Sequence, residues 1–198
     1  MRFSIILPAY NAADRIIKTL ESIKQQTFTD YELIAICDSC HDNTEEICKS
    51  YGAITEAVEF HGAGLSRNRA LEIAKGDWIL FMDDDDWYLH EYVLEQLDKK
   101  LTQNPDIDVL ICSFIIKGLQ YATPRDDQGY LWPAVWNKAW KRSFVGDSKF
   151  STSRGANDLD FHNVVMAKNP RILEWDMPIY YYNYMRPGSI TEEDRRAV

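Results

Sequence analysis

Residues 78–87 read WILFMDDDDW, an apolar run that passes directly into four consecutive aspartates. A short, continuous apolar run of this kind is typical of a strand that is buried on both faces of a parallel sheet. The clustered carboxylates repel one another, and a hard divalent cation such as Mg²⁺ or Mn²⁺ would offset that repulsion. An acidic turn between a strand and a helix is the alternative, and the stretch alone leaves both interpretations open.

Apolar runs elsewhere in the chain predict three more buried strands, at 3–7 (FSIIL), 32–36 (ELIAI) and 108–116 (DVLICSFII). Periodic apolar positions between these runs predict helices at 11–26, 42–52, 65–75 and 90–103. Asn11 and Asp42 are expected to cap the first two helices, the second through a capping box with Glu45. Strands that alternate with helices predict an α/β fold with a mostly parallel sheet, which binds its ligands at the carboxyl ends of the strands.

Residues 117–153 follow a less regular pattern that is rich in aromatic side chains, and we expect short strands and loops that cover the sheet. Trp136 and Trp140 lie four residues apart, which fits one packed face of a helix. Aromatic rings also stack on sugars, but a core role is favoured for most of them. A helix is predicted at 157–168, and a strand or hairpin at 172–184.

The composition limits the class of protein. The chain has 198 residues and a net charge of −9, and such an acidic surface repels nucleic-acid backbones. An acidic protein that binds a phosphorylated small molecule usually needs a cation to mediate the contact. We expect neither a signal peptide at the N-terminus nor an integral membrane anchor, because no apolar run is long enough. A cytoplasmic location with reduced cysteines is therefore expected.

The stretch ICDSCHDNT (36–44) admits three interpretations. Cys37, Cys40 and His41 spell CxxCH, which attaches covalent haem in exported proteins, and the two cysteines also form a CxxC that could belong to a zinc site. No further cysteine or histidine follows at the spacing of a zinc ligand. Packing thiols in an acidic loop, with Asp38 and Asp42 as the working residues, are the favoured interpretation.

Four stretches of the first half occur in the order of the motifs of glycosyltransferase family 2, which this chain resembles. They are SIILPAYNAADRI (4–16), CDSCHDNT (37–44), GLSRNRALEIAKGDW (64–78) and FMDDDDW (81–87). Each is weak alone, but the joint match in order is specific. Three stretches of the second half match more loosely, namely WNKAWKRSF (136–144), GANDLDF (155–161) and YYNYMRPGSIT (181–191).

The resemblance implies the GT-A fold, a Rossmann-like and mostly parallel central sheet flanked by helices, with a smaller mixed C-terminal portion. Residues 1–198 would form a single domain. Residues 1–116 would be its nucleotide-sugar-binding half, and residues 117–198 would carry the acceptor side and the catalytic base. A separate acceptor-binding domain is expected to be absent.

The resemblance also implies a role for each acidic residue of WILFMDDDDW. Asp83 would contact the ribose of the donor, and Asp84 would also belong to the donor site. Asp85 is the leading candidate for the metal, which would be Mg²⁺ or Mn²⁺. Asp86 would bind the metal or its water, or cap the following helix, and these alternatives stay open.

Other matched positions supply the rest of the implied site. The turn Pro8-Ala9-Tyr10 would contact the base or ribose, Arg67 would lie near the nucleotide, and Arg186 would close over the diphosphate. Asp158 would be the general base, although a residue before a helix is also a candidate N-cap. These site residues are Pro8, Ala9, Tyr10, Asp38, Arg67, Asp83, Asp84, Asp85, Asp86, Asp158 and Arg186.

Two positions depart from the family pattern. Cys37 occupies the place of the aspartate that reads the nucleotide base, so the adjacent Asp38 is the residue expected to take that role. Asn157 replaces a glutamate, which removes one charge beside Asp158 without removing the base.

The implied function is metal-dependent transfer of a sugar from a nucleoside-diphosphate sugar, with a UDP-sugar favoured, to a hydroxyl group with inversion. The acceptor would be a carbohydrate, a lipid-linked molecule or another hydroxyl compound, and no nucleic acid is expected as a partner. The enzyme would be cytoplasmic, or peripheral at the inner face of the membrane. The alternative is a non-catalytic module that binds a nucleotide sugar.

Overall fold

The computed structural model describes residues 1–118, 120–152, 157–184 and 186. Within these residues, nine strands form one sheet in the order β3-β2-β1-β4-β8-β6-β9-β5, with β7 paired to β6. The strands are β1 (Phe3–Ala9), β2 (Tyr31–Asp38), β3 (Ile54–Val58), β4 (Trp78–Phe81), β5 (Trp87–Tyr88), β6 (Val109–Ile116), β7 (Gln120–Ala122), β8 (Lys138–Lys141) and β9 (Ile172–Tyr182). The helices are α1 (Ile16–Lys24), α2 (Thr44–Ser50), α3 (Ala63–Ile73), α4 (Val93–Gln103), α5 (Arg142–Val145) and α6 (Asn157–Met166).

The strands β3, β2, β1 and β4 are parallel and form the first half of the sheet. Every residue of β1 is buried, as the apolar run at 3–7 predicts, and β4 is buried along its whole length. The predicted strands at 32–36, 78–82 and 108–116 correspond to β2, β4 and β6. The prediction of a mostly parallel α/β fold is thus confirmed, and β3 is an additional strand at the sheet edge whose half-exposed pattern gave no apolar run.

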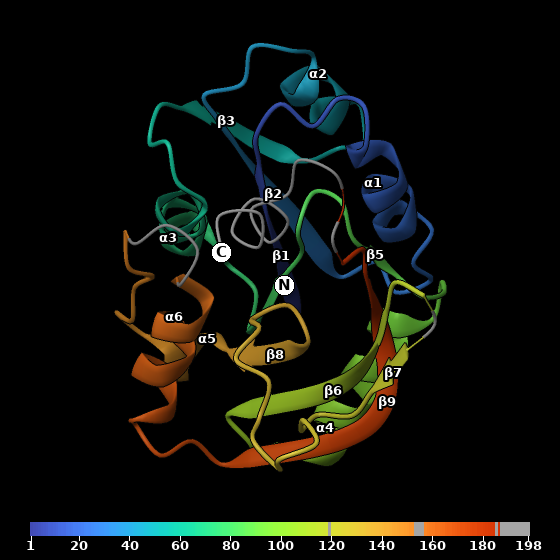
Figure 1. Cartoon of the computed structure of the whole chain (residues 1–198), viewed down its shortest axis with the longest axis vertical. Helices are drawn as coiled ribbons and strands as arrows, with labels where there is room; N and C mark the ends of the chain where they lie inside the picture. Colours follow the sequence, from blue (N-terminus) through green and yellow to red (C-terminus); the bar gives the residue numbers. More distant parts are fainter. Residues whose placement is uncertain (119, 153–156, 185, 187–198) are drawn as a thin grey trace.

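The strand order reverses direction at β1. The chain moves outward from β1 to β2 and β3, then returns through α3 to β4 on the opposite side of β1. Right-handed crossovers in opposite directions place their helices on opposite faces of the sheet, and Figure 1 shows α1 and α2 apart from α3. In open α/β sheets, ligands bind at such a reversal, in the crevice outside the carboxyl ends of the strands. Residues 10–15 and 83–86 lie at this point.

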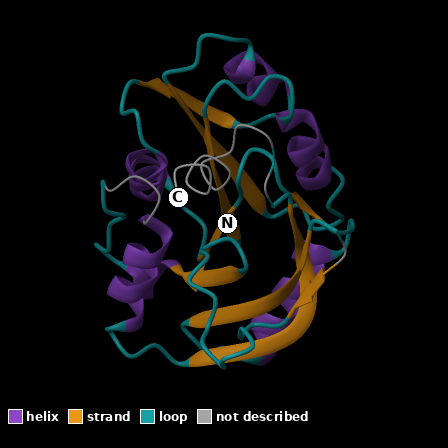
Figure 2. Cartoon of the chain, viewed as in Figure 1, coloured by secondary structure: helices purple, strands orange, loops and turns teal. Residues whose placement is uncertain are grey.

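The second half of the sheet is mixed. Strand β8 is antiparallel to both β4 and β6, while β9 is parallel to β6. The long strands β6 and β9 curve across this half, as Figure 2 shows. This mixed portion matches the expectation for the C-terminal half, and its aromatic core includes Phe150 stacked on Phe161 with ring centroids 4.0 Å apart.

The aromatic stretch before and within β8 does not form the predicted helical face. Trp140 lies in β8, whereas Trp136 lies in the preceding loop. Trp136 stacks on Tyr180 of β9, with ring centroids 4.6 Å apart and ring planes 12° apart. The four-residue spacing predicted one helical face, but Trp140 is buried from a strand and Trp136 from the loop before it. The core role that was favoured for these rings is confirmed.

The predicted helix starts also need correction. Asn11 does not cap α1, because it adopts a φ of 42° and its side-chain oxygen accepts the N–H of His41 at 2.8 Å. The helix begins at Ile16 instead. The capping residue of α2 is Asn43, and Glu45 forms an ion pair with Lys49, so the predicted capping box is absent from α2.

Two further expectations concerned reduced cysteines and the lack of a membrane anchor. All four cysteines are free thiols. In the part of the chain that the structure describes, no helix combines the length and the apolar character needed to cross a membrane.

A buried polar network joins the central strand to the connection between α3 and β4. The hydroxyl of Ser4 donates to Glu32 at 2.6 Å and accepts the N–H of Gly76 at 2.8 Å. A Cβ atom on Gly76 would lie 2.4 Å from the backbone nitrogen of Ser4 and 2.5 Å from the carbonyl carbon of Phe3. Only glycine allows this close approach of two backbones.

We expect Gly76→Ala to lower the free energy of unfolding by about 3 kcal/mol, because the clash is with backbone atoms of the central strand. Urea unfolding followed by circular dichroism measures the loss. Gly62→Ala is the matched control, since a Cβ there meets nothing within 4 Å, and we expect a change within about 1 kcal/mol. Equal losses in the two variants would contradict the close-approach argument.

Candidate active site

The loops after β1 and β4 are tied together by an ion pair between Arg15 and Asp84. The Arg15 guanidinium donates to both carboxylate oxygens of Asp84, at 3.0 and 2.9 Å. It also donates to the carbonyl oxygens of Tyr10 and Asn11, and the Tyr10 N–H reaches Asp84 at 3.3 Å. This pair fixes the turn after β1 against the loop of four aspartates after β4 (83–86), the acidic loop of the site.

Arg15 was not among the predicted site residues. A cation at the start of a helix is unfavourable, because the helix dipole is positive there. Arg15 occupies the capping position of α1, but the sequence places the helix start at Asn11, so this unfavourable position was not apparent before the structure.

Arg67 joins the acidic loop to the start of α6. Its guanidinium donates to Asp83 at 2.7 Å, to Asp158 at 2.9 Å and to the side-chain oxygen of Asn157 at 2.8 Å. The Arg67 side chain is buried, and its guanidinium lies 5.3 Å from the centre of the Phe150 ring. Three predicted site residues from distant parts of the sequence, Arg67, Asp83 and Asp158, are therefore brought together.

The acidic loop is electrostatically crowded. Burial raises the pKa of Asp83 to about 6; Asp158 and Asp85 act in the same direction, and Arg67 opposes them. Burial also raises the pKa of Asp84, which Arg15 counteracts. Each carboxylate is therefore held in its charged form mainly by one neighbouring guanidinium.

The last two aspartates of the loop have different surroundings. Asp85 accepts a hydrogen bond from the Nε atom of Arg186 at 2.5 Å. Asp86 is fully buried, and its two oxygens accept the Tyr180 hydroxyl at 2.8 Å and the Asn183 N–H at 2.7 Å. Burial raises the pKa of Asp86 well above its ordinary value. The helix-cap alternative for Asp86 is wrong, since α4 begins only at Val93.

The donor set allows a divalent cation at one carboxylate. Among the described residues, no three His, Cys, Asp or Glu side chains are grouped as a protein-only metal site would require. Mg²⁺ is commonly held by one or two carboxylates together with substrate phosphates, so such a group is not needed. Asp85 fits this type of binding, because the hydrogen bond given for its carboxylate comes from an arginine side chain rather than from the backbone. Asp86 fits it less well, because both of its oxygens already accept hydrogen bonds from the protein.

Asp38, at the end of β2, holds the loop between β3 and α3. Five donors reach its carboxylate, namely the N–H groups of Phe60, His61 and Gly62 and the hydroxyls of Ser39 and Ser66. Burial works against the charged form, but the three backbone N–H groups hold the pKa of Asp38 below its ordinary value. Asp38 thus fixes this loop at the carboxyl end of β2, the strand that pairs with β1.

The remaining predicted residues lie at the same edge of the sheet. Pro8 and Ala9 end β1 and are buried, whereas the Tyr10 side chain is 59% exposed. Asp158 lies in the first turn of α6 rather than before it, and its second oxygen accepts the N–H of Val135 at 3.3 Å. The carboxylate of Asp158 is therefore fixed at both oxygens, by Arg67 and by Val135.

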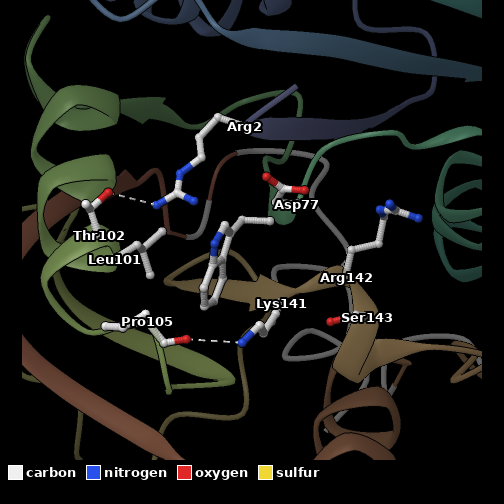
Figure 3. Close-up of a pocket in the computed structure, with 9 residues that line it drawn as sticks. Arg2, Asp77, Leu101, Thr102, Pro105, Lys141, Arg142 and Ser143 are labelled. Atoms are coloured by element: carbon white, nitrogen blue, oxygen red, sulfur yellow. Dashed lines mark hydrogen bonds between the residues drawn. The ribbon is translucent and has the colours of Figure 1, made fainter.

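A cavity of about 430 Å³ lies elsewhere, at the amino ends of the central strands (Figure 3). Arg2 precedes β1, Asp77 precedes β4, and both line this cavity together with Lys141. It is therefore separated by the length of the strands from the carboxylates at their carboxyl ends. The cavity is not part of the candidate active site.

Comparison with known sequences identifies relatives. The pattern of "Glycosyl transferase family 2" matches residues 4–160. An uncharacterized glycosyltransferase of Haemophilus influenzae is 35% identical over 127 residues, which are 61% of this chain and 42% of that protein. A poly(ribitol-phosphate) beta-glucosyltransferase of Bacillus spizizenii is 35% identical over 116 residues, 54% of this chain and 18% of that protein. The chain thus spans less than half the length of either relative.

Solved structures share the fold. Staphylococcus aureus TarS 1–349, in complex with UDP-GlcNAc, superposes with a TM-score of 0.83 at 23% identity and covers 97% of this chain and 61% of that one. The mannosyltransferase PcManGT from Pyrobaculum calidifontis, in complex with GDP-Man and Mn²⁺, gives a TM-score of 0.77 at 19% identity over 99% and 61% of the two chains. The expected GT-A fold is confirmed.

We expect Asp38→Asn to lower the free energy of unfolding by about 2 kcal/mol at neutral pH, because an amide leaves buried donors unsatisfied. The folded-state pKa of Asp38 is lowered, so its contribution is present above the unfolded pKa of about 3.9 and is lost as the pH falls through the folded value. The difference between wild type and variant should therefore shrink at about pH 3.

Urea unfolding at both pH values measures this difference. Asp106→Asn is the control, because the Asp106 side chain is 91% exposed and lies 3.7 Å from Arg171, which makes a long, exposed ion pair. A stability loss for Asp38→Asn that does not change with pH would show that the carboxylate charge is not what holds the loop.

Proposed function

Because the chain belongs to glycosyl transferase family 2, we propose that it transfers a sugar from a UDP-sugar to a hydroxyl group, with inversion and with a divalent cation. The observation that carries this proposal is the Arg67 bridge, which sets Asp158 beside the acidic loop at the carboxyl ends of β1 and β4. A donor bound at that crevice and an acceptor beside α6 would meet at Asp158.

The donor side of the proposal uses the residues that follow β1 and β4. Pro8, Ala9 and Tyr10 would contact the base and ribose, Asp83 the ribose, and Asp38 would act through the loop that it holds. A cation such as Mn²⁺ or Mg²⁺ on Asp85 would stabilise the negative charge of the departing diphosphate. Asp86 would support the loop through Tyr180.

Two arginines complete the donor side. Arg186 pairs with Asp85 and would turn to the diphosphate, which is a better match for a guanidinium than a single carboxylate. Arg15 donates to Asp84. Asp84 would therefore keep the loop of the donor site in place rather than bind the donor itself.

Asp158 is the proposed general base. The acceptor hydroxyl must lose its proton as its oxygen attacks the anomeric carbon, and a carboxylate opposite the leaving group can accept that proton. Attack from the face opposite the diphosphate inverts the anomeric centre. Asn157 lacks the charge of a glutamate but accepts a hydrogen bond from Arg67 beside Asp158, and this arrangement favours an enzyme over a non-catalytic binding module.

The comparisons support the choice of donor and acceptor class. TarS is in complex with UDP-GlcNAc, and PcManGT with GDP-Man and Mn²⁺. The Bacillus relative is named for transfer to poly(ribitol-phosphate). We therefore propose a UDP-sugar donor and a hydroxyl of a carbohydrate, polyol polymer or lipid-linked acceptor, used in the cytoplasm or at the inner face of the membrane.

We expect UDP, with UDP-glucose or UDP-GlcNAc, to raise the melting temperature in the presence of Mn²⁺, because a ligand that binds only the folded state stabilises it. GDP and GDP-mannose serve as the comparison. Asp85→Asn should lose the Mn²⁺ dependence of the shift, whereas Asp106→Asn should keep it. A chain that responds to no nucleotide would contradict the proposal.

We expect Asp158→Asn to lower the rate of UDP release from a UDP-sugar by at least about 100-fold, because a proton acceptor contributes about that much. Donor binding, measured by calorimetry, should survive. Asp160→Asn is the matched control on the same helix, since Asp160 accepts a hydrogen bond from Ser151 and should leave the rate unchanged. Equal activity of wild type and Asp158→Asn would remove Asp158 from the mechanism.

A further inference from the structure

Lys138 is a fully buried lysine in β8 whose charge the proposed reaction does not use. Its ammonium donates to the carbonyl oxygen of Trp132 at 2.6 Å, to that of Ala134 and to the side-chain oxygen of Asn137 at 2.8 Å. An ammonium has three N–H donors, and these three acceptors use all of them. The lysine is thus a fixed anchor rather than a group that reaches substrate.

The backbone that Lys138 holds leads directly to Asp158. Val135 follows the two anchored carbonyl groups, and its N–H donates to Asp158 at 3.3 Å. The Val135 carbonyl oxygen accepts the indole N–H of Trp140 at 3.0 Å. Residues 132–135 are therefore held from β8 on both sides of the N–H that meets Asp158.

The carboxylate of Asp158 has two fixed contacts and would turn without one of them. Arg67 holds one oxygen at 2.9 Å, and Val135 holds the other. Torsions that end in a carboxylate are broad, with no narrow staggered minimum. Within the described part of the chain, loss of the Val135 contact would leave Arg67 as the remaining hydrogen-bond donor to Asp158, and the carboxylate could rotate away from an acceptor hydroxyl.

The charges around Asp158 come from three elements. Arg67 approaches from α3, Asp83 from the loop after β4, and Lys138 from β8. Burial lowers the pKa of Lys138 to about 7, while Asp158 acts to raise it again. Burial and the nearby Lys138 lower the pKa of His162 to about 4, so this histidine is neutral at neutral pH and adds no charge.

We propose that Lys138 is a positioning residue of the transfer reaction, which fixes the 132–135 backbone so that the Val135 N–H orients Asp158. The inference rests on the proposed function. Lys138 acts through Asp158 and leaves the donor site at β1 and β4 untouched, so its loss affects turnover and spares donor binding.

The test compares Lys138→Met with Lys141→Met. Lys141 lies on the same strand and also donates to backbone carbonyls, those of Pro105 and Ile107, but beside the cavity at the other end of the sheet (Figure 3). With UDP-GlcNAc and UDP-glucose as donors and Mn²⁺ present, we expect kcat for UDP release to fall about 10- to 100-fold in Lys138→Met, with KM unchanged. Lys141→Met should match wild type, and donor-binding stoichiometry corrects each rate for the folded fraction.

A double-mutant cycle separates positioning from general damage. If Lys138 acts through Asp158, Lys138→Met should add little in an Asp158→Asn background. The full loss in both backgrounds, a rise in KM alone, or an unchanged kcat would each overturn the inference while the proposed function stands. A wild type that binds donor but releases no UDP overturns the proposed function and this inference with it.

A second variant covers the case in which Lys138→Met does not fold. Trp140→Phe removes the other anchor of the same segment, the indole N–H on the Val135 carbonyl, and retains the lysine and most of the ring volume. We expect the same pattern of lower kcat and unchanged KM for this variant. A Trp140→Phe enzyme with the kcat of wild type would overturn the inference.

Discussion

The site depends on one buried guanidinium group, which lies between two carboxylates. Arg67, on α3, pairs with Asp83 after β4 and with Asp158 on α6. Without the guanidinium the two carboxylates would repel each other in a partly dehydrated crevice, where such repulsion is only weakly screened. Asp83 follows the parallel half of the sheet and Asp158 lies on α6 beyond the mixed half, so the ion pairs of Arg67 also hold these two parts of the structure against each other.

The sequence predicts the parts of the fold in which one physical signal dominates. The strands β1, β2, β4 and β6 are buried on both faces, and each is visible as a continuous apolar run. The strands β3, β5 and β8 are short or lie at positions where burial alternates with exposure, so no run marks them. Asn11 shows why helix starts are harder to predict. It is a good capping residue, but in the folded chain its side chain accepts a hydrogen bond from His41 instead.

In the candidate site, too, some features could be predicted from the sequence and others could not. Carboxylates that follow a buried strand lie at the ligand-binding edge of an α/β sheet, so the position of Asp83 to Asp86 could be predicted. Their partners could not, because Arg15, Arg67 and Tyr180 reach them across the fold and have no fixed sequence spacing to them. The hydrogen bonds of Asp38 could not be predicted either, since four of its five donors, at positions 60, 61, 62 and 66, lie more than twenty residues further along the chain.

The partners of the four aspartates bear on how an acidic protein could receive the proposed diphosphate donor. Asp83, Asp84 and Asp85 are each paired with a different arginine, and Asp86 is satisfied by a hydroxyl and a backbone N–H. Three guanidiniums thus face the four aspartates of the loop and Asp158, and each guanidinium is already paired with a carboxylate. A donor with two negative phosphates would therefore have to bring charge of the opposite sign or take a guanidinium from a carboxylate. Arg67 bridges two carboxylates and Arg15 also donates to two backbone carbonyl groups, whereas Arg186 donates to Asp85 from the segment that follows β9. A cation at Asp85 would free the Arg186 guanidinium for the diphosphate, so a single exchange there would supply both positive groups that the leaving diphosphate requires.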